Sequence, residues 1–489
     1  MLEPVGLPPS LPARICQRAL DARDSRFDGL FFVGIVTTGI YCRPICPSKR
    51  ADPHHRRFFN SAAAAERAGF RPCLRCRPEL APGRAVTHAV SRLACTAAHR
   101  IAAGALNGRS VAELAAELAV SERHLRRALR RELGVSPVEL AQTHRLLLAK
   151  RLLAETALSV TDVAFASGFE SLRRFNVAFH ERYGMSPSAL RRPSPAPASD
   201  LLRMTLAYRP PLAWDVLTAF LQRDAMPGVE IVEGRRYGRT VRLDGRSGVV
   251  FAEDAPAEAH VKVDISPSLL PVLMPLLARL RQLFDLDAQP TVVDAHLERA
   301  GLAALVRRHR GVRLPGALDG FEIGFRTLLG DGELAGRAAR ALGEPLEAGF
   351  PALHLLAPDA GRVIAAGASG LAVLGVPRRR AEVILAFARA VAAGALRLEP
   401  GNDMAETQRA LEKAGVDERL ATIIVMRALY WPDAFPASDR ALQQAAGVAS
   451  PRALRARAEK WRPWRAYAAL HLWLQQAAPD LRRPRREPH

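Results

Sequence analysis

The sequence contains no long hydrophobic run and comparatively few acidic residues. No uninterrupted apolar stretch in the 489 residues approaches the roughly 18–20 residues of a membrane-spanning helix. The opening MLEPVGLPPSLPARICQ lacks the basic segment followed by an apolar segment that marks a secretory signal. We therefore expect a cytoplasmic protein with no membrane partner. Only 49 Asp and Glu oppose 70 Lys and Arg, and this net charge of +21 favours a polyanion such as nucleic acid.

Cysteine is also scarce, and its distribution argues against a disulfide framework. Four of the six cysteines stand in two close pairs, at 42 and 46 and at 73 and 76. Such pairs in a reducing compartment favour a metal site. Cys16 and Cys95 have no partner at this spacing, and we expect both to be small buried hydrophobic residues.

Changes in composition divide the chain into four segments and a linker. A chain of 489 residues exceeds the size at which one hydrophobic core usually keeps growing, so several domains are expected. The alternating Pro, Ser and Ala of RRPSPAPAS cannot continue a helix and predict an extended linker at 193–199. The four segments are 1–80, 85–192, 200–296 and 297–480.

The spacing of apolar residues predicts the secondary structure of these segments. Residues 1–80 are mixed, whereas 85–192 place apolar residues at the three- and four-residue spacing of helices. Within 200–296, VEIVEGRRYGRTVRL and HVKVDI alternate as strands do, which predicts an α/β domain. Residues 297–480 return to helical patterns broken by Gly and Pro.

The helical segment contains an internal repeat. SVAELAAELAVSERHLRRALRRELGVSP at 110–137 aligns with SVTDVAFASGFESLRRFNVAFHERYGMSP at 159–187. Each copy is typical of helix, short turn, helix, and Ser121 is well placed to cap the second helix of the first copy. Two similar helix-turn-helix modules fit this pattern, and an ordinary helical bundle is the alternative.

The paired cysteines predict a zinc site. Cys42 and Cys46 form C-x3-C, and Cys73 and Cys76 form C-x2-C after a gap of 26 residues. Two loops at this spacing can close a tetrahedral shell of four thiolates, the donor set that Zn²⁺ favours. We expect one zinc ion, and a purely structural zinc knuckle is the competing interpretation.

The surrounding residues resemble the zinc domain of Ada-type DNA alkylation-response proteins over about residues 15–80. RFDGLFFVGIVTTGIYCRPICPS and AAAAERAGFRPCLRCRPE carry the resemblance. It implies that Cys42 accepts a methyl group from a methylphosphotriester of the DNA backbone. It also implies that Thr38, Lys49 and Arg71 contact DNA, although an arginine is more familiar at the Lys49 position.

Zinc–thiolate chemistry makes the implied role of Cys42 intelligible. A zinc-bound thiol stays a thiolate at neutral pH, and the thiolate is the nucleophilic form of sulfur. Four thiolates on Zn²⁺ carry a formal charge of −2, and methylation of one leaves −1. The resemblance implies that this change strengthens DNA binding and that each molecule acts once.

The helical segment at 85–192 resembles an AraC-type DNA-binding domain, with GxSP at 134–137 and again at 184–187. The resemblance implies recognition helices at about 122–132 and 171–182. Arginines on these helices are candidates for contacts with phosphates or base edges, and a solvated helix face is the alternative for each. These candidates are Arg123, Arg126, Arg127, Arg130, Arg173 and Arg174.

Residues 200–480 resemble the AlkA-type 3-methyladenine DNA glycosylases. VMRALYWPDAFPASDRALQQ at 425–444 and AEKWRPWRAYAALHLWL at 458–474 give the best local matches. The resemblance implies that Asp439 is the catalytic aspartate, which stabilises an oxocarbenium-like state after the damaged base has flipped out. From its position alone, Asp439 is also a good helix cap.

The sequence departs from the glycosylase pattern in its hairpin and wedge loops. Where the family usually has LPGIGxWTAxY, this chain has KAGVDERLATII, which places Asp417 at a phosphate-binding turn and Arg419 and Ile423 at aromatic positions. The wedge loop reads GDGEL, with Gly332 near the wedge position. We interpret the three C-terminal tryptophans as core aromatics: Trp461, Trp464 and Trp473.

These resemblances predict a multidomain protein, α/β and mainly α. Its expected parts are a small four-cysteine zinc domain, a double helix-turn-helix domain, an α/β domain and a helix-hairpin-helix domain. We expect it to bind double-stranded DNA at alkylated and promoter sites on the nucleoid and to contact RNA polymerase. No PCHR motif occurs, so repair of O6-methylguanine is not expected. The competing hypotheses are a transcription factor with a structural zinc knuckle and a regulator whose glycosylase half only holds DNA.

Overall fold

The computed structural model describes residues 11–83, 92–191 and 200–477, and the expected linker at 193–199 lies outside them. The chain forms two compact units. The first comprises Met1–Arg209, Val241–Arg281 and Leu286–Ala288, and the second comprises Pro210–Thr240, Gln282–Asp285 and Gln289–His489.

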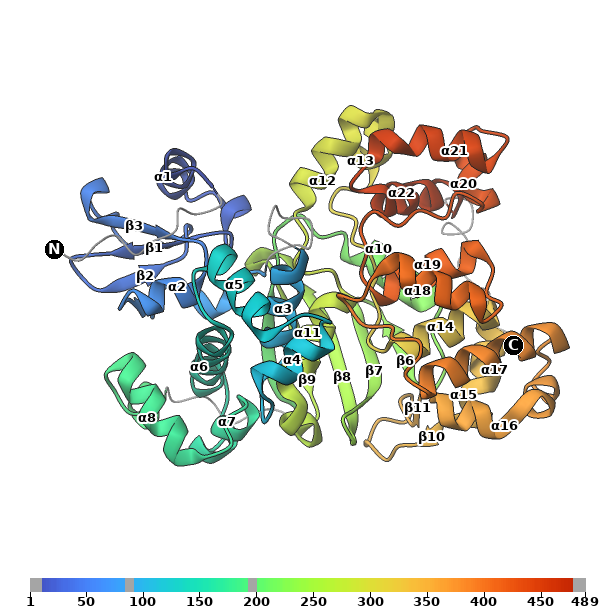
Figure 1. Cartoon of the computed structure of the whole chain (residues 1–489), viewed down its shortest axis with the longest axis horizontal. Coiled ribbons are helices and arrows are strands. Elements are labelled where there is room, and N and C mark those ends of the chain that lie inside the picture. Colours follow the sequence, from blue (N-terminus) through green and yellow to red (C-terminus); the bar gives the residue numbers. More distant parts are fainter. Residues whose placement is uncertain (1–10, 84–91, 192–199, 478–489) are drawn as a thin grey trace. The chain divides into compact units, whose positions relative to one another are not determined.

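The first unit begins with a small α/β region. Its elements are α1 (Ala13–Ala22), β1 (Phe32–Ile35), β2 (Ile40–Cys42), β3 (Arg56–Phe59), α2 (Ala62–Arg67) and β4 (Arg71–Pro72). The strands form one sheet in the order β3-β1-β2-β4 (Figure 1). β2 lies antiparallel to β1, with Val33 opposite Cys42, and parallel to β4, with Tyr41 opposite Pro72. This register places Cys42 and Cys73 at neighbouring strand ends.

Two small apolar clusters support this sheet. On one side Cys16 of α1 is fully buried with Phe31 and Val33. On the other, Tyr41 lies in the centre of a cluster that includes Phe59. The expectation that Cys16 is a buried hydrophobic residue is confirmed, and burial raises the pKa of its thiol to about 11.

The helical part of the first unit contains the predicted repeat. Its helices are α3 (Arg92–Ala102), α4 (Val111–Glu117), α5 (Glu122–Leu133), α6 (Pro137–Glu155), α7 (Val160–Ala166), α8 (Leu172–Tyr183) and α9 (Pro187–Leu190). Serines cap both copies at matching places: Ser110 and Ser159 begin α4 and α7, and Ser121 and Ser171 begin α5 and α8. The predicted cap by Ser121 is confirmed, and Cys95 on α3 is buried as expected.

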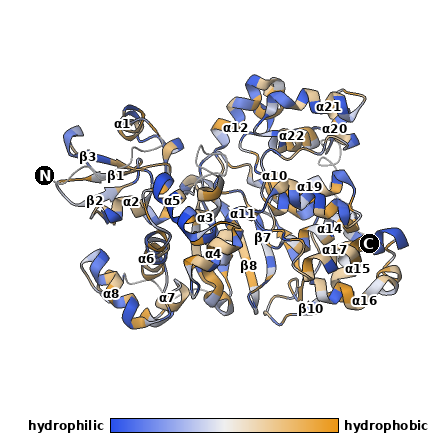
Figure 2. Ribbon diagram, in the orientation of Figure 1, coloured by the Kyte–Doolittle hydropathy of each residue, from blue (hydrophilic) through white to orange (hydrophobic). Residues whose placement is uncertain are grey.

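The second helix of each copy has one buried face. α5, with the sequence ERHLRRALRREL, buries Leu125, Leu129 and Leu133 and is largely hydrophilic in Figure 2. α8 buries Phe175 and Phe179. Because apolar residues recur at four-residue spacing, the opposite faces of both helices remain free to carry charge.

A buried carboxylate joins the α/β region to the helices of the first unit. Glu66 on α2 accepts hydrogen bonds from the hydroxyl groups of Tyr41 (3.0 Å) and Thr143 on α6 (2.7 Å). Its side chain is fully buried and pairs with Arg182 of α8 at 2.9 Å. Burial raises the pKa of this carboxyl, and Arg182 opposes the rise. One side chain therefore links β2, α6 and α8.

A five-stranded sheet follows in the order β5-β9-β8-β7-β6. Its strands are β5 (Leu202–Ala207), β6 (Glu230–Glu233), β7 (Arg236–Leu243), β8 (Arg246–Ala255) and β9 (His260–Ile265). The alternating segments of the sequence correspond to β6, β7 and β9, as predicted. Two helices accompany the strands, α10 (Trp214–Arg223) and α11 (Leu273–Leu283).

Helices dominate the rest of the chain, in agreement with its sequence pattern. They are α12 (Pro290–Leu297), α13 (Ala303–Arg308), α14 (Gly320–Leu329), α15 (Gly332–Leu342), α16 (Ala360–Val373), α17 (Arg378–Ala392), α18 (Met404–Lys413), α19 (Glu418–Ala428), α20 (Arg440–Ala445), α21 (Pro451–Ala458) and α22 (Arg465–Ala477). Two short strands, β10 (Glu344–Pro345) and β11 (Leu355–Leu356), pair with each other. None of the helices among the described residues is long and apolar enough to cross a membrane.

The second unit contains two apolar cores and a helical hairpin. One core gathers residues of α14 to α19, and the other gathers residues of α12, α13 and α20 to α22. Trp461 and Trp464 lie in the second core, which confirms the interpretation of these two tryptophans. α18 and α19 form the hairpin, with Gly415 at φ +89° in the turn and Asp417 capping α19 through Leu420 N (3.0 Å).

Candidate metal centre and carboxylate cavity

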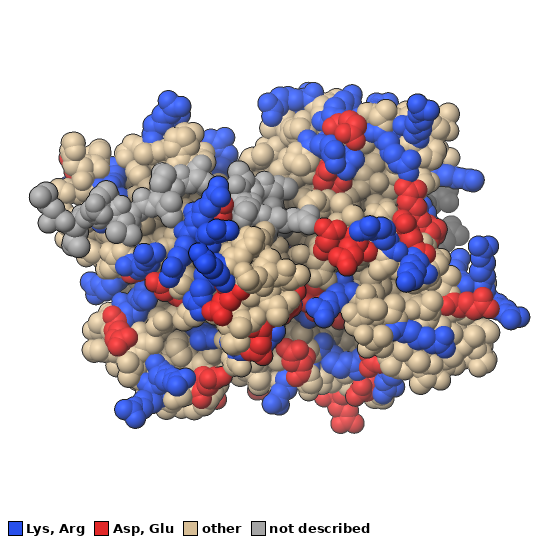
Figure 3. All heavy atoms as spheres, viewed as in Figure 1, with Lys and Arg blue, Asp and Glu red and all other residues tan. Residues whose placement is uncertain are grey.

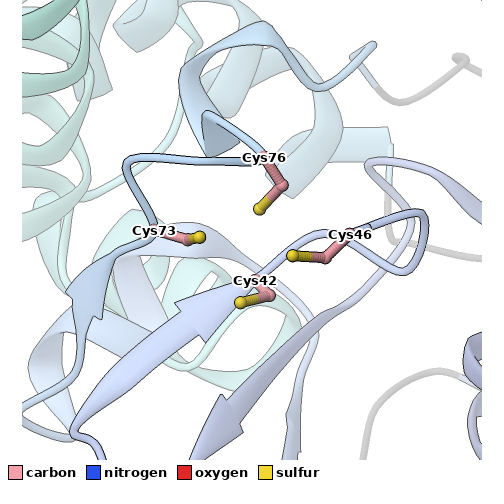
Figure 4. A group of neighbouring side chains, drawn as sticks. All are labelled: Cys42, Cys46, Cys73 and Cys76. Carbon is pink, nitrogen blue, oxygen red and sulfur yellow. The ribbon is translucent and has the colours of Figure 1, made fainter. Parts of the chain in front are cut away.

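Four cysteines gather at one end of the N-terminal sheet. Cys42 ends β2 and Cys46 follows in the next turn, while Cys73 follows β4 and Cys76 lies in the turn after it. Their sulfur atoms all lie within 4.8 Å of one another. Figure 4 shows the four sulfur atoms pointing toward a common centre. The two cysteine pairs thus close one shell, as their spacing predicts.

The chemistry of this shell fits a divalent zinc ion. A hydrogen bond between Cys42 and Cys46 raises the pKa of Cys42 and lowers that of Cys46, because the thiols compete for protons. A cation removes this competition, since each sulfur can then remain a thiolate. Zinc accepts four thiolates in a tetrahedral arrangement, and this cluster is a site for one zinc ion.

The four cysteines differ in exposure. Cys42 is partly exposed, whereas Cys46, Cys73 and Cys76 are buried. Exposure of the residue thus distinguishes Cys42 from its three partners, while all four cysteines belong to one buried cluster.

Two buried cations adjoin the sulfur cluster, and the sequence reasoning missed both. The backbone N–H of Arg43 donates to the sulfur of Cys76 (3.4 Å), and the Arg43 guanidinium pairs with Asp28 (Nε–Oδ1 2.9 Å). Lys150 on α6 donates to the carbonyl of Cys73 (3.5 Å) and pairs with a glutamate. Arg43 lies inside the motif YCRPIC and could have been singled out there. Lys150 is 77 residues from Cys73, so no local signal marks it.

The three predicted DNA-contact residues near the sulfur cluster are all exposed. Thr38 lies in the turn between β1 and β2, and Arg71 begins β4. The backbone N–H of Arg71 donates to the carbonyl of Gly39 (2.7 Å), which places Arg71 beside that turn. Lys49 lies in the loop after Cys46. All three side chains are accessible to a ligand at the surface.

The arginines predicted on the two recognition helices lie on α5 and α8. On α5, the side chains of 123, 127 and 130 are exposed, and Arg126 is half-buried and pairs with Glu122 at 2.5 Å. Figure 3 shows basic side chains gathered over α5. Arg173 and Arg174 are exposed on α8. Both helices thus present positive charge on the face opposite their apolar core.

A cavity of about 480 Å³ lies in the second unit. Its walls come from α10, α14, the start of α15, α19 and α22, together with the residue that caps α20. Both apolar and charged side chains line it. The lining includes Arg326, Gly332, Arg419, Ile423, Arg427, Asp439 and Trp473.

Asp439 is the nearly buried carboxylate of this cavity. Its Oδ1 accepts the backbone N–H of Leu442 (3.0 Å), so it caps α20 as its position predicts. The indole N–H of Trp473 points to the same oxygen at 3.4 Å. The other oxygen, Oδ2, lies 3.6 Å from Arg419 Nη1. Trp473 is half-buried and packs against the second core, as expected of a core aromatic, and it also lines the cavity beside this carboxylate.

A buried ion network supports the part of the cavity wall that α14 provides. Arg326 on α14 pairs with Glu322 (2.8 Å) and with Glu230 of β6, and Arg239 of β7 pairs with Glu322 at 2.7 Å. Charges this deeply buried persist only when they are mutually compensated. The network therefore holds Arg326 in one place at the cavity.

A zinc-binding cluster, a duplicated helix-turn-helix and a helix-hairpin-helix body together define a DNA-binding protein of the repair and regulatory class. Family descriptions match each part: "Metal binding domain of Ada" at 15–79, "Helix-turn-helix domain" at 114–193 and "AlkA N-terminal domain" at 203–319. The "Probable bifunctional transcriptional activator/DNA repair enzyme AlkA" of Mycobacterium tuberculosis (strain H37Rv) is 36% identical over 477 residues, 94% of this chain and 95% of that protein. The chain belongs to this AlkA family of bifunctional transcriptional activator/DNA repair enzymes.

Other relatives match one part of the chain each. "DNA-3-methyladenine glycosylase 2" of Escherichia coli (strain K12) is 33% identical over 277 residues, 55% of this chain and 96% of that protein. The "Bifunctional transcriptional activator/DNA repair enzyme Ada" of the same strain is 33% identical over 172 residues, 35% of this chain and 46% of that protein. The first part of the chain is thus similar to Ada and the second to a glycosylase.

We expect one zinc ion per chain in freshly purified, reduced protein, measured by elemental analysis. Cys73→Ser and Cys76→Ser should lower this content and unfold the N-terminal region, because metal binding in so small a domain supplies much of its folding free energy. Cys16→Ser and Cys95→Ser are matched controls that should keep the metal. A zinc content near zero in the wild type would contradict the assignment.

Proposed function

We propose that this protein repairs and reports DNA alkylation with two separate sites. At Cys42 it takes a methyl group from a DNA methylphosphotriester in a single turnover. The helix-turn-helix pair then activates transcription at promoter sites through contact with RNA polymerase, and the cavity at Asp439 excises alkylated bases such as 3-methyladenine. The observation that carries the first step is the partial exposure of Cys42 in a cluster whose other three cysteines are buried.

The methyl transfer needs a nucleophile, a bound phosphate and a leaving group. Bound zinc supplies a thiolate at neutral pH. The sulfur of Cys42 attacks the methyl carbon, a C–S bond forms, and the C–O bond breaks with its electron pair on the phosphate oxygen. Arg71 and Lys49 hold the DNA backbone and stabilise the phosphodiester anion that is released. Cys42 ends as a neutral thioether, which does not revert.

The same reaction changes the charge that faces DNA. Four thiolates around a divalent ion carry a formal −2, and the thioether reduces this to −1. Repulsion between this cluster and the DNA backbone falls, so the exposed cations near it attract phosphate more strongly. Methylation at Cys42 thereby favours promoter binding by the whole first unit.

Base excision is assigned to the cavity of the second unit. A base flipped out of the duplex enters beside Trp473, which offers a stacking surface. Asp439 stabilises the positive charge that develops on the sugar as the glycosidic bond breaks. Water then adds to the sugar, and the base and an abasic site are released.

Two features, one in the hairpin and one in the wedge loop, weaken capture of the substrate. Asp417 caps α19 with its own carboxylate at the turn where a glycine-rich hairpin would bind phosphate, and it opposes a second anion there. Gly332, at the start of α15 on the cavity wall, provides no wedge side chain. These features favour the alternative function, in which the second unit binds DNA but does not excise bases. Measurement of excision by the wild type and by Asp439→Asn distinguishes the two functions.

Incubation with methylphosphotriester DNA should add the mass of one methyl group to Cys42, located by peptide mass spectrometry. Cys42→Ala should abolish the uptake, and Cys16→Ala and Cys95→Ala should retain it. Cys42→His separates chemistry from folding, since imidazole can complete a zinc shell but supplies no thiolate. Methyl transfer that persists in Cys42→Ala would relocate the acceptor, and no transfer to the wild type would favour a structural zinc site.

Methylated protein should bind promoter-like DNA about tenfold more tightly than unmethylated protein at low salt, because one negative charge near phosphate has been removed. Fluorescence anisotropy over a salt series would measure both affinities, and added salt should shrink the difference. Equal affinities of the two forms at low salt would count against the switch.

Asp439→Asn should lower single-turnover excision of 3-methyladenine by about 100-fold or more, because a charge that stabilises the transition state is lost. Asparagine is as good a helix cap as aspartate, so α20 should remain folded. Asp417→Gly should raise excision by relieving repulsion of the DNA backbone. If the wild type and Asp439→Asn are equally inactive, the second unit is a binding platform.

A further inference from the structure

The cavity of the second unit contains a cation directly beside its nearly buried carboxylate. Arg419 Nη1 lies 3.6 Å from Asp439 Oδ2, and both residues line the cavity. The Arg419 side chain is 41% exposed, whereas the Asp439 side chain is 12% exposed. The guanidinium is therefore the more accessible member of the pair, and a ligand that approaches the carboxylate encounters it.

Other arginines of the cavity have different partners. Arg427 pairs with Asp224 at 2.9 Å, and Arg326 pairs with Glu322 at 2.8 Å. These two are buried and held by the surrounding structure. Arg419 extends from the first turn of α19 and has greater freedom to contact a bound base.

We propose that Arg419 sets the base preference of this site. It slows excision of purines that are positively charged in DNA, as purines alkylated at N3 or N7 are, and favours neutral purines with a carbonyl at position 6, such as hypoxanthine. This inference rests on the proposed excision at Asp439.

The positive charge of Arg419 disfavours a cationic base in the cavity. A cationic N-alkylpurine nucleoside in the cavity is repelled by the guanidinium. Arg419 also partly neutralises Asp439, the group that would attract this substrate and stabilise its positively charged sugar. The aromatic positions of α19 carry Arg419 and Ile423, so this helix offers no ring to stack on the cationic base.

The hydrogen-bonding chemistry of arginine favours a neutral 6-oxopurine. A guanidinium donates well to the O6 and N7 acceptors of a 6-oxopurine. When the glycosidic bond of a neutral purine breaks, its electron pair leaves on the base, and Arg419 at the carbonyl stabilises that negative charge. Water supplies hydroxide to the sugar and a proton to the departing base. A cationic base leaves neutral instead, and its water releases the proton to solvent.

Ordinary guanine presents the same acceptors and must be rejected before it reaches Arg419. Guanine in a normal pair resists flipping, whereas a mismatched or damaged base flips at lower cost. Hypoxanthine opposite thymine therefore enters the cavity more readily than guanine opposite cytosine. The hairpin that captures DNA weakly adds to this selection.

The test compares two 6-oxopurines that differ in charge: hypoxanthine opposite thymine and cationic 7-methylguanine opposite cytosine. Single-turnover excision from each duplex is measured with the full-length protein and with Arg419→Gln. We expect the variant to excise hypoxanthine about tenfold more slowly and 7-methylguanine about tenfold faster, so the ratio of the two rates changes about 100-fold. A variant that is merely misfolded would lose both activities together.

Two matched variants separate position from charge. Arg419→Lys keeps the positive charge and should retain the preference for the neutral base. Arg440→Gln removes an exposed arginine next to Asp439 in the sequence, and it should leave the ratio unchanged. An unchanged ratio in Arg419→Gln, or an equal shift in Arg440→Gln, would overturn the proposal.

A binding measurement distinguishes this inference from the proposed function. Duplexes carry a cationic pyrrolidine or a neutral tetrahydrofuran in place of one nucleoside, and Arg419→Gln should favour the pyrrolidine about tenfold more than the wild type does. If neither base is excised but this shift occurs, the proposed excision fails and the electrostatic role of Arg419 stands. If bases are excised but neither the rate ratio nor the binding shifts, Arg419 does not set the preference.

Discussion

Four sulfur atoms within 4.8 Å of one another impose the constraint on which the N-terminal region depends. Strand register places Cys42 and Cys73 side by side, and the two turns supply the remaining ligands. Such a cluster of thiolates needs a cation at its centre. The backbone N–H of Arg43 donates to the sulfur of Cys76, and Lys150 of α6 donates to the carbonyl of Cys73, so the metal site is connected to both the sheet and α6. Its reactivity and its folding role have the same electrostatic origin.

Local chemistry made much of this protein predictable. The cysteine spacing predicted one shell, and Ser121 predicted the start of the second helix in the first helix-turn-helix copy, since ligands and caps act over a few residues. Contacts between distant residues left no such signal. Trp473 packs against the second core and also lies beside Asp439, and the pairing of Arg419 with Asp439 joins two helices separated by a loop. Hydrophobic spacing identifies a buried helix face but does not determine which of its members meets a cavity.

Glu66 gives the first unit a physical connection between its metal-binding and helical parts. Its carboxylate contacts Tyr41, the residue before Cys42, and reaches Thr143 and Arg182 on two helices. Removal of Tyr41 would leave Oε1 of this buried carboxylate without its hydroxyl donor, which is costly, whereas Thr143 and Arg182 share Oε2. Cys42 and the arginine-bearing helices are consequently parts of one cooperative structure, and a charge change at the sulfur cluster acts on a body that already includes the helix-turn-helix pair.

The carboxylate that Asp417 places at the hairpin turn also bears on how the protein searches a chromosome. Binding to undamaged DNA depends chiefly on phosphate contacts. In the proposed function the Asp417 carboxylate, which caps α19 at the hairpin turn, repels phosphate and shortens each unproductive encounter. The genome offers a vast excess of such encounters for every lesion. Under the proposed function, a protein that dissociates quickly from undamaged DNA samples more sites in a given time, and the exposed arginines of α5 and α8 are the proposed contacts that retain it at promoters.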